Sequence, residues 1–153
     1  MYLETFSKRL KDLMEWEDMS TRALSKVIHA DRKGVRGWLQ GCYFPRWDTL
    51  IKIADYFHVS IDFLVGMEDC DELAYMVAFK AVTVEEAKEK FSSSLKTFMQ
   101  QNHLTIYAVA KGAKVGQKPV KNWLVKGSMP ETMTIIRLAH LMKCSIDSLF
   151  GRR

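Results

Sequence analysis

The chain has 153 residues, of which 48% are hydrophobic and 27% charged, a composition typical of folded proteins rather than of disordered chains. Its formal net charge of +5 favours a polyanionic partner. The longest apolar run, 73–79, is much shorter than the roughly 20 residues of a membrane-spanning helix, and no secretory signal is evident. The three cysteines form no Cys-x-x-Cys pair, so reduced thiols and a cytoplasmic location are expected.

The sequence repeats itself with an offset of 85 residues, which aligns 6–66 with 91–151 without a gap. Roughly a third of the aligned positions are identical, among them Phe6/Phe91 and Trp38/Trp123. Most other apolar positions stay apolar. A repeat of this length predicts two copies of one structural unit. We expect a first domain at 1–66, a linker at 67–82 and a second domain at 83–153.

Each copy predicts short helices, taken here in chain order. Phe6, Leu10 and Met14 recur at helical spacing and open the first copy. Pro45 and Pro130 precede the fourth helix of each copy, and no alternating run is long enough for a strand. The expected N-caps share a side-chain oxygen ahead of an apolar run: Ser20, Asp31, Ser60, Thr83, Thr105 and Ser145. The predicted fold class is therefore all-α.

An ordered set of short motifs occurs in both copies. In the first copy these are Met19–Ser25 (MSTRALS), Val35–Gly41 (VRGWLQG), Pro45, Ile53-Ala54 and Val59–Leu64 (VSIDFL). In the second copy they are Leu104-Thr105, Val109–Lys111, Val120–Leu124, Pro130, Leu138-Ala139 and Cys144–Leu149. The set resembles the Cro/CI-like (XRE-type) helix-turn-helix domains of bacterial and phage repressors.

The resemblance implies two tandem five-helix bundles of the lambda-repressor-like DNA-binding type, joined by a linker helix. It also implies a sequence-specific transcriptional regulator, a repressor, that reads two half-sites of double-stranded DNA with two recognition helices. Three features depart from the family pattern. The turn before the recognition helix usually has glycine, whereas the two copies have His29 and Lys114. Gly34 interrupts the first recognition helix, and Pro119 interrupts the second.

Outward positions of the two recognition helices are the candidates for reading bases in the major groove. With Val35 and Trp38 facing inward, the first copy presents Arg32, Lys33 and Arg36, while Gly37 offers no side chain. The second copy holds Gln117, Lys118, Lys121 and Asn122 in the same positions. Because arginine suits guanine whereas glutamine and asparagine suit adenine, the two half-sites are expected to differ.

Phosphate contacts are expected from two further places in each copy. At the start of the second helix, where free N–H groups favour an anion, these are Thr21, Arg22, Thr105 and Tyr107. In the loops after the recognition helices they are Arg46, Lys126 and Ser128. The segment 91–153 has ten Lys/Arg against two Asp/Glu, whereas 1–66 has ten against nine. The second copy is therefore the expected electrostatic anchor.

The linker begins acidic and becomes apolar, and we predict that it is helical. As a helix, 67–90 would span about 36 Å, close to the ~34–36 Å between adjacent half-sites. Its apolar residues Leu73, Met76, Val77 and Phe79 are candidates for a surface that binds a second copy or another protein. The aromatic run 43–47 fits ordinary packing as well as a contact with the DNA backbone, the other copy or another subunit.

Protein binding is the main alternative to DNA binding. An antitoxin or co-regulator would act through protein–protein contacts, and the family also includes such proteins. An enzyme is not expected, because no phosphate loop or nucleophile motif is present and His29, His58, His103 and His140 lack the spacing of metal ligands. Neither a cofactor nor a metal is expected.

Overall fold

Helices form where apolar residues recur every three or four positions, as the sequence predicts. The computed structural model of the chain describes residues 1–67 and 79–153, and within these ranges it contains no strand. The fold is all-α. None of the helices described is both long enough and apolar enough to pass through a bilayer.

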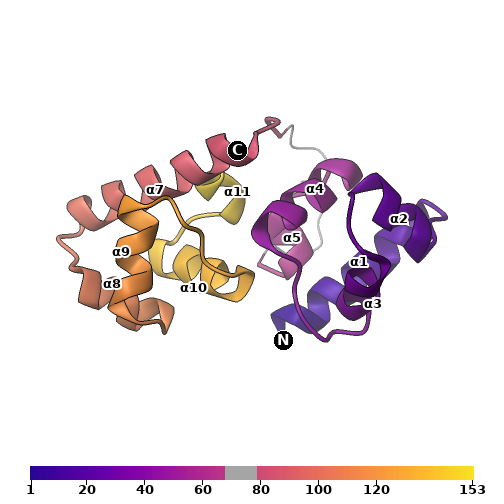
Figure 1. The fold of residues 1–153 in the computed structure, drawn as a ribbon, viewed down its shortest axis with the longest axis horizontal. Helices are drawn as coiled ribbons and strands as arrows, with labels where there is room; N and C mark the ends of the chain where they lie inside the picture. The colour runs from indigo at the N-terminus through magenta and orange to yellow at the C-terminus, as the bar shows by residue number, and fades with distance from the viewer. Residues whose placement is uncertain (68–78) are drawn as a thin grey trace. The chain divides into compact units, whose positions relative to one another are not determined.

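The chain divides into two compact units, unit 1 at Met1–Phe79 and unit 2 at Lys80–Arg153 (Figure 1). The helices of unit 1 among the described residues are α1 (Tyr2–Trp16), α2 (Thr21–Val27), α3 (Arg32–Leu39), α4 (Trp47–Phe57) and α5 (Ile61–Val65). Those of unit 2 are α7 (Val84–Gln101), α8 (Ile106–Ala113), α9 (Gln117–Val125), α10 (Thr132–Met142) and α11 (Ile146–Leu149). The division falls inside the segment 67–82 that we expected to be a linker.

The helices follow the sequence repeat. Both ends of α10 lie 85 residues after the ends of α4, and α8 and α9 begin with the same offset from α2 and α3. The pairs α1/α3 and α2/α3 are in contact in unit 1, as are the corresponding pairs α7/α9 and α8/α9 in unit 2. The repeat in sequence is therefore also a repeat of helices.

The core positions of unit 2 are buried in unit 1 as well. The core of unit 2 consists of Phe91, Leu95, Val109, Ala110, Ala113, Val120, Trp123 and Leu138. The residues 85 positions earlier are all buried too: Phe6, Leu10, Leu24, Ser25, Ile28, Val35, Trp38 and Ile53. In unit 2 the ring of Phe91 meets that of Trp123 edge-on, with centroids 6.3 Å apart. The recognition helices that we predicted are thus held by one tryptophan each.

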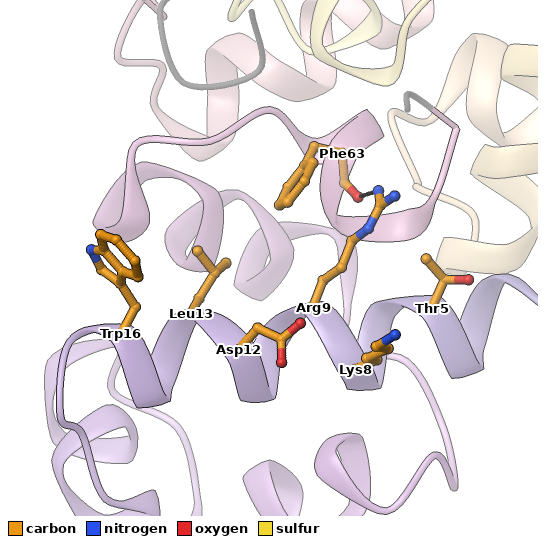
Figure 2. Close-up of a pocket in the computed structure, with 7 residues that line it drawn as sticks. All are labelled: Thr5, Lys8, Arg9, Asp12, Leu13, Trp16 and Phe63. Carbon is orange, nitrogen blue, oxygen red and sulfur yellow. Dashed lines mark hydrogen bonds between the residues drawn. The ribbon is translucent and has the colours of Figure 1, made fainter. Parts of the chain in front are cut away.

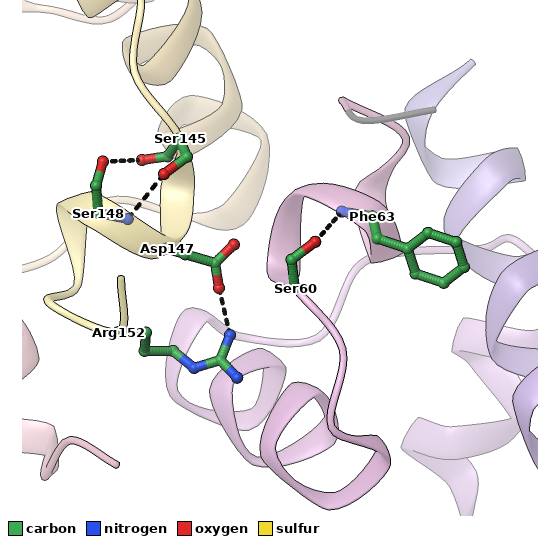
Figure 3. Close-up of polar contacts among 6 residues, drawn as sticks. All are labelled: Ser60, Phe63, Ser145, Asp147, Ser148 and Arg152. Atoms are coloured by element: carbon green, nitrogen blue, oxygen red, sulfur yellow. Dashed lines mark hydrogen bonds and ion pairs between the residues drawn. The ribbon is translucent and has the colours of Figure 1, made fainter. Parts of the chain in front are cut away.

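The predicted caps are present. Ser60 Oγ accepts a hydrogen bond from the N–H of Phe63, and Ser145 Oγ accepts one from the N–H of Ser148 (Figure 3). Thr83 and Glu86 form a reciprocal capping box at the start of α7. Each cap satisfies N–H groups that a helix cannot bond internally, which stops the helix from extending backwards along the chain.

The predicted linker helix is wrong over the part of it that the structure describes. Residues 79–83 have no helical structure, and α7 begins only at Val84. The capping box explains the break, because Thr83 adopts an extended backbone conformation in order to cap α7. A continuous helix over 67–90 is therefore excluded, while 68–78 lie outside the described residues.

Candidate nucleic-acid interface

The turn between α2 and α3 sets the direction of the candidate recognition helix in unit 1. Ser20 caps α2 through the N–H of Ala23, and Asp31 caps α3 through the N–H of Lys33 at 3.3 Å. Between these caps His29 adopts the left-handed conformation, with φ 55°. The N–H of Ala30 then bonds to the carbonyl of Ser25 at 2.9 Å, which closes the turn.

Unit 2 builds the same turn with different residues. Thr105 caps α8 through the N–H of Ala108, and Lys114 takes the left-handed position with φ 59°. The N–H of Val115 bonds to the carbonyl of Ala110 at 3.0 Å, matching the bond in unit 1. Gly116 precedes α9 without a side-chain cap. Pro119 is the third residue of α9, where its missing N–H costs no hydrogen bond within the helix.

The helix α3 has the two faces that the sequence predicts. Val35 and Trp38 are buried, whereas the side chains of Arg32, Lys33 and Arg36 are exposed. Ser7 on α1 fixes the end of α3, because its hydroxyl donates to the carbonyl of Trp38 at 2.5 Å.

Gly37 differs from the prediction. It occupies the outward side of α3 but is buried, since the ring of Tyr43 lies over it. The outward face of α3 therefore does carry a side chain at this position, and it comes from the following loop.

The helix α9 presents polar side chains at the corresponding positions. Gln117, Lys118 and Lys121 are exposed and Asn122 is partly buried. Val120 and Trp123 face the core. The C-terminal residue of the helix, Val125, is 82% exposed, an apolar group that no sequence pattern pointed to.

The residues expected to contact phosphate are accessible to different degrees. At the start of α2, Arg22 is exposed and Thr21 partly buried, and at the start of α8 both Thr105 and Tyr107 are exposed. Thr105 Oγ1 accepts the capping bond, so its hydroxyl proton is left to donate outward.

The loops after the candidate recognition helices α3 and α9 contain the remaining residues predicted to contact phosphate. Arg46, Lys126 and Ser128 are all exposed. Arg46 is also engaged within the protein, because its guanidinium lies 3.5 Å from a carboxylate oxygen of Asp48. That pair reduces the positive charge that Arg46 offers to an anion.

The electrostatic character of the two units differs. In unit 2 the cations of α8, α9 and the turns that follow them are exposed: Lys111, Lys114, Lys118, Lys121 and Lys126. No acidic residue occurs between Phe91 and Pro130. In unit 1 the exposed Asp31 stands next to Arg32 and Lys33. Among the residues that the structure describes, the side chains of Arg32, Lys33, Arg36, Lys118 and Lys121 form no ion pair.

A groove in unit 1 was not anticipated from the sequence. It runs along α1 beside α5, has a volume of about 690 Å³, and is lined by Thr5, Lys8, Arg9, Asp12, Leu13, Trp16 and Phe63 (Figure 2). Trp16 is 87% exposed. Arg9 is held within the protein, since its guanidinium donates to the carbonyl of Phe63 and lies 4.5 Å from the centroid of that ring.

The predicted partner surface is only partly visible. Leu73, Met76 and Val77 lie outside the described residues, and Phe79 is partly buried. Across the described ranges, no group of three or more His, Cys, Asp or Glu side chains is placed to hold a metal ion. Among the described residues, Cys42 and Cys144 take part in no disulfide bond, and Cys70 lies outside these residues.

The chain was compared with protein families, curated proteins and solved structures. No protein-family model, curated protein or solved structure matches the chain.

Proposed function

We propose that the chain is a sequence-specific DNA-binding transcriptional regulator, a repressor of the Cro/CI-like helix-turn-helix type. Each unit is a lambda-repressor-like domain, and α3 and α9 are its two recognition helices. The observation that carries the proposal is that both helices have one buried side and one polar, solvent-facing side. Each helix buries one tryptophan and one valine. On the other side α3 exposes Arg32, Lys33 and Arg36, and α9 exposes Gln117, Lys118 and Lys121.

Several features support DNA rather than another polyanion as the partner. The exposed arginines of α3 suit the two acceptors of a guanine edge, and Gln117 suits adenine. Lysines on α8 and α9 provide cations for phosphates on either side of the inserted helix. The two helices carry different side chains at matching positions, so the operator consists of two unlike half-sites. A regulator of this kind works in the cytoplasm, where the DNA of a bacterial or phage-infected cell lies.

The proposal is tested by letting the full chain select the sequences it binds from a pool of random DNA duplexes. We expect an asymmetric consensus with one guanine-containing half-site. A variant with Arg32→Ala and Arg36→Ala should lose base preference in that half-site. Removing one arginine from a guanine edge should cost about 1–3 kcal/mol of discrimination.

The matched control removes four exposed cations elsewhere. Lys11→Ala, Lys52→Ala, Lys90→Ala and Lys96→Ala together remove as much charge as Arg32→Ala, Arg36→Ala, Lys118→Ala and Lys121→Ala, but from α1, α4 and α7. The control variant should keep the consensus and most of the affinity. If the pool yields no consensus, or if both fourfold variants bind equally well, the proposal is wrong.

A second candidate, protein binding by an antitoxin or co-regulator, is favoured by the groove around Trp16. An exposed indole beside Leu13 and Phe63 is typical of surfaces that bind an apolar side chain of a partner. The dependence of binding affinity on salt concentration distinguishes DNA binding from protein binding. Affinity based on phosphate contacts falls steeply between about 50 and 200 mM salt, whereas affinity based on apolar contacts changes little.

A further inference from the structure

The outward face of α3 contains a buried glycine. Gly37 is two residues after the buried Val35, about 200° further round the helix. Lys33, four residues earlier on the same face, is exposed, and so is Arg36. A residue in this position would ordinarily face solvent, so something must cover it.

Tyr43 is the residue that covers Gly37. A Cβ atom built on Gly37 would lie 2.5 Å from both Cζ and Oη of Tyr43, closer than any real contact. The hydroxyl of Tyr43 donates to the carbonyl of Lys33 at 3.5 Å. The N–H of Cys42 donates to the carbonyl of Gly37 at 2.9 Å, which fixes the loop immediately before the tyrosine. The ring is thus held on the ridge between Lys33 and Gly37.

Part of the Tyr43 side chain remains accessible. Tyr43 is 46% exposed although its hydroxyl and ring are both in contact with α3. Its side chain therefore adds an apolar surface to the part of α3 that also bears Lys33 and Arg36. A ring already held by packing loses little conformational entropy when a ligand contacts it.

Unit 2 shows the reverse distribution of side chains. With the offset of 85, Asn122 corresponds to Gly37 and Ser128 corresponds to Tyr43. The helix supplies the larger side chain in unit 2, and the loop supplies it in unit 1. In both units one side chain covers the position of Gly37 or Asn122 on the outward face. The helix needs glycine there only in unit 1, where the loop supplies the ring of Tyr43.

We propose that Tyr43 is a specificity-determining contact residue of unit 1, with the C5-methyl group of a thymine in the major groove as its ligand. The proposal rests on the function proposed above, because it assumes that α3 enters the groove. A thymine methyl is the apolar feature of that groove, and an aromatic ring edge is a suitable apolar partner. Asn122 in the same place of unit 2 reads hydrogen bonds instead.

The experiment compares single variants on the duplex that the wild-type chain selects. Tyr43→Ala should weaken binding about tenfold, whereas Tyr43→Phe should stay within about twofold because the ring is kept. Tyr56→Ala is the matched control, since Tyr56 is a tyrosine of unit 1 with 38% exposure that lies on α4. It should bind like the wild type.

Deoxyuridine then locates the contact, because it differs from thymidine only by the methyl group. Replacing the contacted dT should weaken wild-type binding about fourfold, the value of one buried methyl group. The same replacement should have no effect on Tyr43→Ala, so the two changes are not additive. No other thymine of the duplex should show this coupling.

Gly37→Ala provides a second route to the same result without altering Tyr43. The added Cβ displaces the ring, so this variant should bind as weakly as Tyr43→Ala while its thermal unfolding shows an intact fold. If the wild-type chain selects a consensus but Tyr43→Ala binds as Tyr56→Ala does, or no deoxyuridine position couples to Tyr43, the inference fails and the proposed function stands. If the wild-type chain selects no sequence, both fail.

Discussion

Non-glycine residues hold the left-handed backbone conformation at matching turns of both units. They are the pairs Asp18/His103, His29/Lys114 and His58/Lys143, all with φ between 52° and 59°. For residues with a Cβ atom this conformation costs roughly 1–2 kcal/mol each. The cost is tolerated because the turns connect helices whose buried faces determine where the chain must go. At His29 and Lys114 the strained residue lies in the turn, three residues before the first residue of a candidate recognition helix.

Glycine at His29 should relieve this strain. We expect His29→Gly to raise the free energy of unfolding by about 0.5–1 kcal/mol, because the strain relieved exceeds the extra entropy of the unfolded chain. Lys26→Gly, three residues earlier inside α2, should lower it by about 1 kcal/mol. Urea unfolding measures both, and a loss of stability in His29→Gly would show that the turn is not strained.

At the scale of the element, α3 and α9 are weak helices held by tertiary contacts. The eight residues of α3 include Gly34 and Gly37, and α9 contains Pro119. A helix of this length and composition is not stable alone in water. Packing of Val35 and Trp38, or of Val120 and Trp123, therefore supplies the stability.

Gly34 differs from Gly37 in what surrounds it. A Cβ on Gly34 would lie 3.6 Å from the ring of Trp38, an ordinary van der Waals distance. Gly34→Ala should therefore stabilise unit 1 by up to about 1 kcal/mol through helix propensity alone. Chemical denaturation checks this, and base preference should not change. A destabilised Gly34→Ala would mean that α3 has no space on this side.

The short helix α11 is secured by a buried ion pair. The guanidinium of Arg152 donates to the carboxylate of Asp147, and both side chains are inaccessible to solvent (Figure 3). The carbonyl of Arg152 also accepts the N–H of Lys80 at 2.8 Å, which ties the end of the chain to the segment before α7. Unit 1 has Met67 in place of Arg152, so that position of unit 1 carries no guanidinium group.

Replacing Arg152 should destabilise unit 2 but not unit 1. Arg152→Ala leaves Asp147 buried without its cation, which costs about 3–5 kcal/mol. Amide hydrogen exchange should speed up over α7–α11, while α1–α5 keep their protection. Adding Asp147→Ala should restore part of the stability, and Lys96→Ala on the surface of α7 is the control. Equal exchange in all variants would contradict the role assigned to this pair.

For the whole molecule, the feature that matters is the uneven distribution of charge. The segment 91–153 has a net charge of +8 by count of its ten Lys/Arg and two Asp/Glu, against +1 for 1–66. Long-range attraction to a polyanion therefore acts mainly on unit 2. If the proposed function holds, unit 1, in which Asp31 stands beside Arg32, selects among sequences that unit 2 has already brought close.

Salt dependence tests this division of roles in the full chain. Lys118→Ala with Lys121→Ala should lower affinity for all duplexes alike and reduce the slope of log affinity against log salt by about 2. Lys90→Ala with Lys96→Ala on α7 removes the same charge and should leave the slope nearly unchanged. An equal reduction by both pairs would indicate non-specific attraction rather than phosphate contacts.

Much of the fold could be predicted from the sequence, because the relevant interactions are local or periodic. The helix caps at Ser20, Thr105 and Ser145 were confirmed, since a cap depends on residues only three positions apart. The inward positions of Val35 and Trp38 follow from helical spacing. The exposure of Arg32, Lys118 and Lys121 follows from the same spacing, while their role in binding DNA stays a prediction.

The order of the amino acids was thus enough to establish the repeat, the helices with their caps, and the buried side of each helix. Packing in three dimensions was needed to show that Tyr43 covers Gly37, that Asp48 engages Arg46, that Arg152 pairs with Asp147, and that a groove opens beside Trp16. These contacts depend on the path of loops and chain ends, which no periodic pattern encodes. These contacts stabilise the protein only after the helices have packed and brought the loops and chain ends together.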